Sequence, residues 1–115
     1  MYISITGLKV KSFLHTLTFW RYAIPSFMQA EKAPGNLHAS TKTIEGIHYT
    51  VTAWKSKAAM KAYIYSGVHA KAIRKFPKIA TGKTFGFDSE TIPSWSEIPS
   101  LWKANGSYYK NNDET

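Results

Sequence analysis

The chain has 115 residues, no cysteine and a formal net charge of +8, from 15 basic and 7 acidic residues. Its length predicts one domain, and 43% hydrophobic with 15% aromatic residues excludes a disordered chain. Without cysteine there is no disulfide, no thiolate nucleophile and no cysteine-based zinc site, and a reducing cytoplasm is the expected location. The four histidines lack metal-ligand spacing, so no metal site is predicted.

The most apolar N-terminal segment, residues 13–28, is interrupted by His15, Arg21 and Pro25. It is shorter than the roughly 20 residues that a membrane helix needs. Lys9 and Lys11 follow a strand-like run, and no small-residue cleavage site comes after them. We therefore expect no membrane span and no secretion signal.

Basic residues dominate the segment between Glu45 and Asp88, which contains no acidic residue. They are Lys55, Lys57, Lys61, Lys71, Arg74, Lys75, Lys78 and Lys83. A solvated helix face and a patch for an anionic ligand or acidic partner are both compatible with this pattern. A nucleic-acid surface is not predicted, because no zinc-finger spacing, RNP-like aromatic motif or GXXG loop accompanies the charge.

The first half of the chain predicts three strands and a helix. Residues 2–10 are rich in β-branched residues and alternate with a period near two, which predicts a strand. Ser12 is a candidate N-cap for a helix over about 13–31, in which Pro25 predicts a kink or two abutting pieces. A strand over 13–20 is the alternative. After the breaker at residues 33–36, residues 37–44 and 47–54 predict a hairpin that turns around Glu45-Gly46.

In the second half, Ser56 is predicted to cap a helix that runs from Lys57 to about Tyr65 and stops at Ser66-Gly67. A second short helix over 68–75 is expected to end before Pro77, and residues 81–87 predict the last strand. Residues 92–103 predict helical turns that pack Trp95 and Trp102 back onto the domain. The predicted domain spans residues 1–104, and residues 105–115 are expected to form a polar, frayed tail.

This order predicts an α+β protein with the ferredoxin-like βαββαβ arrangement, in which two helices cover one face of a four-stranded antiparallel sheet. Both faces of the third predicted strand are uncharged, whereas a solvated face normally carries Lys, Glu or Asp. The two faces are Ile47, Tyr49, Val51 and Ala53, and His48, Thr50, Thr52 and Trp54. We therefore predict a two-fold homodimer through a sheet face, in which a second subunit covers the side of His48, Thr50 and Thr52.

The segment from His48 to Ile73, HYTVTAWKSKAAMKAYIYSGVHAKAI, places a tryptophan at a strand end before an alanine-rich helix and a Ser-Gly-x-His turn. This segment resembles the dimeric α+β barrel superfamily. Together with Gln29-Ala30-x-x-Ala33-Pro34-Gly35, it resembles small members related to antibiotic-biosynthesis monooxygenases and spheroidene monooxygenase. The resemblance covers about residues 1–88 and implies a ferredoxin-like homodimer.

Haem-degrading members of that superfamily share the Trp-Lys-Ser-Lys of residues 54–57. Carried over from that anchor, their helix tryptophan falls on Tyr63 and their histidine on Ile73, and their first-strand asparagine corresponds to Ser4 or Thr6. Because a haem iron needs an axial ligand such as histidine, the resemblance does not extend to haem chemistry. No cofactor is expected.

Two residues are candidates for catalysis. His69 lies just after Ser66-Gly67, and its imidazole is predicted either to act in a pocket as a base or orienting group, or to bond the backbone around the glycine. Tyr63, on the preceding helix, is the second candidate. His48 alternates with threonines and is interpreted as a buried interface histidine.

Aromatic residues are predicted either to line the space between sheet and helices or to fill the core. The predicted ligand-binding residues are Trp54, Trp20, Phe27 and Phe85, with Phe87 beside them. One hypothesis is a cofactor-independent monooxygenase that acts on an aromatic or polyene small molecule in this pocket. The alternative is a non-catalytic homodimer that binds a small apolar or anionic ligand.

Overall fold

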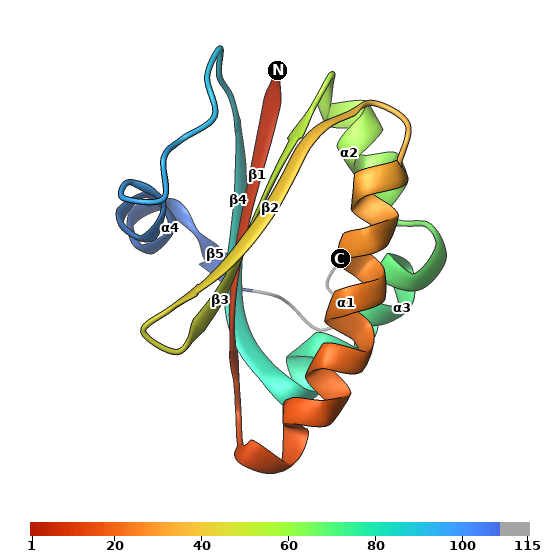
Figure 1. Cartoon of the computed structure of the whole chain (residues 1–115), viewed down its shortest axis with the longest axis vertical. Helices are drawn as coiled ribbons and strands as arrows, with labels where there is room; N and C mark the ends of the chain where they lie inside the picture. Colours follow the sequence, from red (N-terminus) through yellow and green to blue (C-terminus); the bar gives the residue numbers. More distant parts are fainter. Residues whose placement is uncertain (109–115) are drawn as a thin grey trace.

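A computed structural model describes residues 1–108 of the chain, in which helices lie on both faces of an antiparallel sheet (Figure 1). The strands are β1 (Tyr2–Val10), β2 (Asn36–Ile44), β3 (Ile47–Trp54), β4 (Ala80–Asp88) and β5 (Ser107–Tyr108). The helices are the 3-10 turn η1 (Phe13–His15), α1 (Thr16–Lys32), α2 (Lys57–Ile64), α3 (Gly67–Ile79) and α4 (Ile98–Asn105). The strand order is β2-β3-β1-β4-β5.

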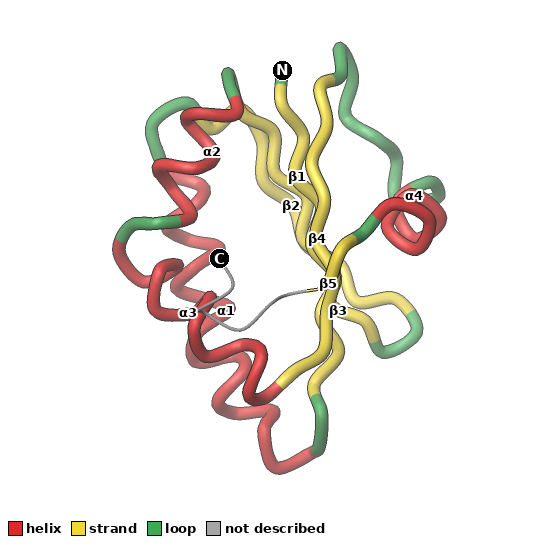
Figure 2. Tube along the Cα trace, turned by 180° about the vertical axis from the view of Figure 1, so that it is seen from behind, coloured by secondary structure: helices red, strands yellow, loops and turns green. Residues whose placement is uncertain are grey.

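The predicted ferredoxin-like α+β fold is confirmed. β1 lies between β3 and β4 and pairs with both, and β2 and β3 form the predicted hairpin. Its turn residues Glu45 and Gly46 both have positive φ, 50° and 79°, as a two-residue turn with the twist of the strands requires. Helices α1, α2 and α3 cover one face of the sheet, and α4 lies on the opposite face (Figure 2).

Two helices continue through prolines that were expected to interrupt them. α1 is one continuous helix around Pro25, because its buried side chains Phe19, Ser26 and Ala30 hold it on the sheet despite one missing N–H donor. α3 runs to Ile79, so the predicted end before Pro77 is wrong. Pro77 lies in the last turn, where it removes only one helical hydrogen bond.

The cap at Ser56 is confirmed, since its Oγ accepts from the backbone N–H of Ala59 at 3.1 Å. Ser12 precedes η1, and its side chain makes no capping hydrogen bond. Gly67 has φ +55°, as expected at a helix stop, and it also opens α3.

Different helices pack on the two faces of the sheet. Side chains of β1 and β3 that alternate toward α4 form a core cluster with Ile98 and Trp102 of that helix. They are Ile3, Ile5, Tyr49, Val51 and Ala53, each at most 1% exposed. The sheet face opposite α1, α2 and α3 is therefore covered by the chain's own C-terminal segment.

This arrangement corrects one prediction. His48, Thr50 and Thr52 do not form a bare surface for a second subunit, because they point toward the helix layer. Sequence alternation separated the two faces of β3 correctly but gave no information on which face the helices would cover.

The C-terminal segment packs as predicted, with Trp102 buried and Trp95 partly buried against the same core cluster. Residues 107–108, expected in the polar tail, pair with Lys83 and Thr84 of β4. The rest of the predicted tail, residues 109–115, lies outside the described residues. Within residues 1–108, no helix combines the length and apolar character that crossing a membrane requires.

Candidate functional site

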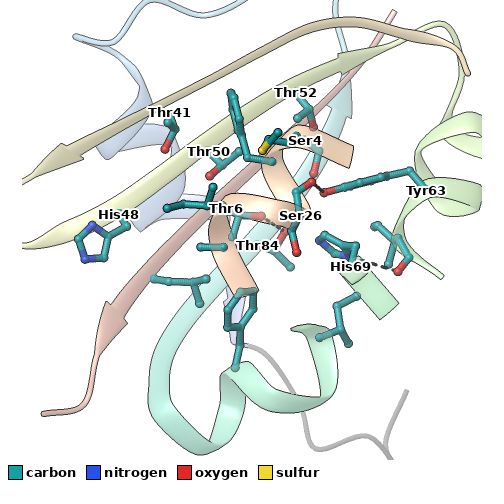
Figure 3. A pocket seen from close by; sticks show the side chains of 18 of the residues that line it. Ser4, Thr6, Ser26, Thr41, His48, Thr50, Thr52, Tyr63, His69 and Thr84 are labelled. Atoms are coloured by element: carbon teal, nitrogen blue, oxygen red, sulfur yellow. Dashed lines mark hydrogen bonds between the residues drawn. The ribbon is translucent and has the colours of Figure 1, made fainter. Parts of the chain in front are cut away.

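A cavity of about 430 Å³ lies between the sheet and the layer formed by α1, α2 and α3. Figure 3 shows its side chains converging from the sheet and from the helices. This volume lies within the range of small-molecule sites, roughly 300–1,000 Å³. No charged residue is among the described residues that line the cavity.

The sheet side of the cavity is a hydroxyl floor, defined as Ser4, Thr6, Thr41, Thr50, Thr52 and Thr84. These residues lie on one face because side chains alternate along a strand, and pairing puts Ser4 opposite Thr52 and Thr6 opposite both Thr50 and Thr84. The Thr6 and Thr84 hydroxyls are hydrogen-bonded at 3.2 Å. The floor is therefore polar, uncharged and partly satisfied within the protein.

The helix side of the cavity is mostly apolar and aromatic. Its rings include Phe19, Trp20 and Phe27 of α1, Tyr63 of α2, Tyr65 just after α2 and Phe76 of α3. Aromatic walls favour flat, ring-shaped ligands, because offset and edge contacts between rings add to the gain from apolar burial.

His69 of α3 lines the cavity, and one hydrogen bond of its ring determines which ring nitrogen carries the proton. Its Nδ1 lies 3.1 Å from the carbonyl oxygen of Ile64, and since a carbonyl only accepts, Nδ1 must carry the proton. Nε2 is then the basic nitrogen of the neutral ring, and no hydrogen bond within the described residues occupies it. The His69 backbone N–H is also held, by the Gln29 side-chain oxygen at 3.0 Å.

The environment of His69 favours the neutral ring. Burial lowers the pKa of His69 below its ordinary value, and the hydrogen bond to the Ile64 carbonyl opposes this with a smaller effect. At neutral pH the ring therefore has an unprotonated Nε2, which is the state that a general base requires.

Tyr63 lies between Trp54 and His69, with ring centroids 5.1 Å from the first and 4.5 Å from the second. Its hydroxyl donates to the Ser26 carbonyl oxygen at 2.8 Å. The Tyr63 hydroxyl thus ties α2 to the backbone of α1 and holds its ring in contact with the ring of His69.

Ser26 is the unusual polar residue of the site. Its side chain is 5% exposed, and its Oγ has no hydrogen-bond partner in the described part of the chain. Figure 3 shows the Ser26 side chain and the His69 ring on the same side of the cavity. A buried hydroxyl without a partner costs about 1–3 kcal/mol, so a ligand oxygen that paired with it would recover that cost.

His48 lines another part of the cavity, between Phe19 and Trp20, with both ring centroids 4.9 Å away. Its Nδ1 is 2.8 Å from the Thr43 hydroxyl, and burial lowers the pKa of His48. Its interpretation as an interface histidine is wrong, because the rings around it come from α1 of the same chain.

The lowered pKa of His69 predicts a pH-dependent stability. Between its ordinary pKa of about 6.5 and its lower folded value, the unfolded chain binds a proton that the folded chain does not. His69 should therefore not reduce the free energy of unfolding above about pH 6.5. Below that pH, the free energy of unfolding should fall as the pH drops toward 5, because the unfolded chain takes up the proton first. Urea titrations at pH 7.5 and 5 should show a smaller loss for His69→Asn than for the parent, and equal losses would contradict this environment.

Four of the six predicted site residues line the cavity together, namely Trp20, Phe27, Tyr63 and His69. Trp54 is fully buried behind Tyr63, and its Nε1 donates to the Thr52 hydroxyl at 2.8 Å, so it supports the wall without lining it. The expectation that Phe85 shares this space is wrong. Phe85 pairs in register with Ile5 and so lies on the α4 face, where it stacks on Phe87 at 5.5 Å.

The prediction missed the hydroxyl floor and Ser26. The floor had a signal in the sequence, because Ser4-Ile5-Thr6 and Thr50-Val51-Thr52 both alternate small hydroxyl and apolar residues within predicted strands. Ser26 had none, since a serine within a helix is common and its burial depends on how α1 lies on the sheet.

Solved structures of other proteins share this fold. The chain is similar to a protein from Nitrosomonas europaea provisionally described as an antibiotic biosynthesis monooxygenase, at 14% identity and a TM-score of 0.69 over 79% of this chain and 100% of that one. It is also similar to SnoaB, a cofactor-independent oxygenase from Streptomyces nogalater, at 10% identity and a TM-score of 0.64 over 81% and 97% of the two chains. A third similar structure is Rv0793 from Mycobacterium tuberculosis, at 7% identity and a TM-score of 0.70 over 82% and 100%.

At these identities the likeness shows the fold, which is the ferredoxin-like α+β fold of the antibiotic biosynthesis monooxygenase structures. A scan of protein-family models finds no match to the chain, and a search of curated proteins finds none either.

Proposed function

We propose that this protein is a cofactor-independent monooxygenase that oxidises an aromatic small molecule in the cavity beneath α1. The observation that carries the proposal is His69, a partly buried imidazole whose Nδ1 is held by the Ile64 carbonyl, whose Nε2 is left to the cavity and whose pKa is lowered by burial. The fold shared with SnoaB, described as a cofactor-independent oxygenase, supports the same class of reaction.

In the proposed reaction, Nε2 of His69 removes a proton from a phenol or from an activated ring carbon of the substrate. The resulting anion is electron-rich and reduces molecular oxygen itself. At a ring CH₂ group, one oxygen atom of O₂ becomes the oxygen of a new carbonyl group. The other oxygen atom leaves as water with the two hydrogens of the CH₂ group. The protein supplies the base, an apolar cavity that excludes water, and the orientation of the ring.

The cavity favours a flat aromatic substrate that bears oxygen atoms. The rings of α1, α2 and α3 would contact its faces, while the hydroxyl floor and Ser26 would contact its oxygens. A polyene is the second choice, since it fits the apolar wall but offers no oxygen to the Ser26 hydroxyl, which has no partner in the described part of the chain. An anionic ligand is less suited to this cavity, because no described lysine or arginine lines it.

Ser26 gives a prediction with two opposite effects. Ser26→Ala should raise the free energy of unfolding of the free protein by about 1–3 kcal/mol, because it removes a buried hydroxyl that lacks a partner. The same change should weaken binding of a phenolic probe, because its oxygen loses that partner. Urea denaturation and fluorescence titration with 1-naphthol measure the two effects, and a loss of stability would show that the hydroxyl is already satisfied.

The test of the proposed function is oxygen uptake by the purified, metal-free protein with a naphthol, an anthrone and a retinoid. The proposal expects oxygen consumption with the phenolic compounds and a product heavier by one oxygen and lighter by two hydrogens for the anthrone. Tight binding of all three without oxygen uptake would favour the non-catalytic ligand-binding protein.

The homodimer and the cytoplasmic location expected from the sequence belong to this proposal as well. Because α4 already covers the centre of the second sheet face, a sheet-face dimer would have to use the partly buried rim that includes Ile44, Ile47, Phe85 and Phe87. Light scattering separates a 13.0 kDa chain from a particle of twice that mass.

A further inference from the structure

Three large apolar side chains project from one end of the molecule, where β1 turns into α1. Phe13 is 90% exposed, Leu14 86% and Leu17 85%. This segment forms the lower end of the molecule in Figure 1. Single exposed apolar residues are ordinary, but three within five positions at a projecting turn form a contiguous apolar tip.

The apolar surface continues from the tip along α1. Leu17, Ile24 and Met28 are seven and four residues apart, so they lie on one stripe of the helix. Ile24 is 53% exposed and Met28 51%, and both line the cavity. The stripe runs from the tip toward the outer side of the candidate site, and the exposed Arg21 lies along it between Leu17 and Ile24.

Positive charge accompanies the apolar tip. Lys11 joins it to the end of α3, since its backbone N–H donates to the Ile79 carbonyl and its Nζ donates to the Pro77 carbonyl, both at 2.8 Å. Exposed basic residues on these elements include Lys9, Lys11, Arg21, Arg74 and Lys78. β1, η1 and α3 contain no acidic residue, and the only one in α1 is Glu31, at the opposite end of that helix.

We propose that the tip and the α1 stripe dock on the surface of an anionic lipid bilayer. Phe13, Leu14 and Leu17 would insert among the acyl chains near the headgroups, as the apolar face of an interfacial helix does. The surrounding lysines and arginines would contact anionic headgroups, which attract basic residues at short range. Docking in this pose would also place Ile24 and Met28 near the bilayer, so an apolar substrate could enter the cavity from the lipid; that last step rests on the proposed function.

A second copy of the chain fits this surface less well. A two-fold contact places the same patch against itself, so Lys11, Arg21 and Lys78 of one copy would approach the same residues of the other. Like charges brought together without acidic partners repel, whereas an anionic bilayer complements them. The charge around the tip thus favours a lipid surface over self-association.

The test is flotation of the intact protein with vesicles of phosphatidylcholine containing 30% phosphatidylserine, compared with vesicles of phosphatidylcholine. We expect binding to the anionic vesicles at low salt, at least a tenfold loss for Leu14→Ser with Leu17→Ser, and a similar loss for Arg21→Glu with Lys78→Glu. Leu37→Ser, which removes a leucine that is 50% exposed on β2, is the matched control and should bind like the parent.

Two outcomes would overturn the proposal. One is a parent protein that stays unbound with anionic vesicles, or whose binding the tip variants do not reduce. The other is a dimer in light scattering that the two leucine changes dissolve, which would identify a second copy as the occupant. Because flotation uses no substrate, failure of the proposed oxygenase activity leaves this test unaffected.

Discussion

Replacement of His69 by asparagine is expected to reduce turnover of a phenolic substrate by about 10²–10⁴-fold, the usual contribution of a positioned general base. The asparagine side-chain N–H₂ can replace Nδ1–H as the donor to the Ile64 carbonyl, so the local structure should persist. No group at the position of Nε2 would then accept the substrate proton. Steady-state oxygen uptake and fluorescence titration measure turnover and binding separately.

The matched control is His38→Asn, which changes an exposed histidine on the α4 face of the sheet, away from the cavity. It should leave turnover unchanged. The proposed role of His69 would be contradicted if His69→Asn kept full activity, or if its loss of activity came only from a lower melting temperature. A His69 variant that binds the substrate normally but does not consume oxygen is the expected outcome.

Truncation of Trp102 to alanine is expected to destabilise the fold by about 3–5 kcal/mol, the range for loss of a buried tryptophan. The Trp102 side chain is 8% exposed, its Nε1 donates to the Lys83 carbonyl at 2.8 Å, and its ring meets Tyr49 edge-on at 5.3 Å. It also packs against Gly7, where an added Cβ would lie only 2.5 Å from the indole. Such a loss is a large part of a typical stability of about 5–15 kcal/mol.

Urea denaturation of Trp102→Ala measures this effect, and Phe13→Ala is the control. Phe13 is a large aromatic residue that is 90% exposed, so its truncation should change the free energy of unfolding by less than about 0.5 kcal/mol. Equal effects of the two truncations would show that α4 does not cover the sheet in solution. The face of Ile3, Ile5 and Val51 would then be open to a second subunit, on the side of the sheet opposite the one expected from the sequence.

Periodicity was sufficient to predict the fold. The alternation of residues 2–10 and 47–54, the turn at Glu45-Gly46 and the cap at Ser56 are local signals, and each produces the expected element. The errors arose where tertiary contacts decide the outcome. α3 passes through Pro77 because Phe76 and Ile79 are buried against the rest of the domain, which local sequence rules do not include.

The candidate site was predicted in part for the same reason. Tyr63 and His69 belong to a helix-turn-helix segment whose geometry is largely local, so placing them together was possible from the sequence. Phe85 was assigned to the wrong face because alternation defines two faces without saying which one the helices cover. The missing partner of Ser26 depends on the packing of α1 against the sheet and on the bond from Tyr63, which only coordinates reveal.

The most direct measurement is long-range ¹H–¹⁵N NMR of the His69 imidazole at pH 7.5, with and without saturating 1-naphthol. We predict a neutral ring with the proton on Nδ1, and an Nε2 resonance that shifts when the phenol binds. Three results would contradict the role of this nitrogen as the base of the cavity. They are a charged imidazole at this pH, a proton on Nε2, and an Nε2 resonance that does not shift when the phenol binds.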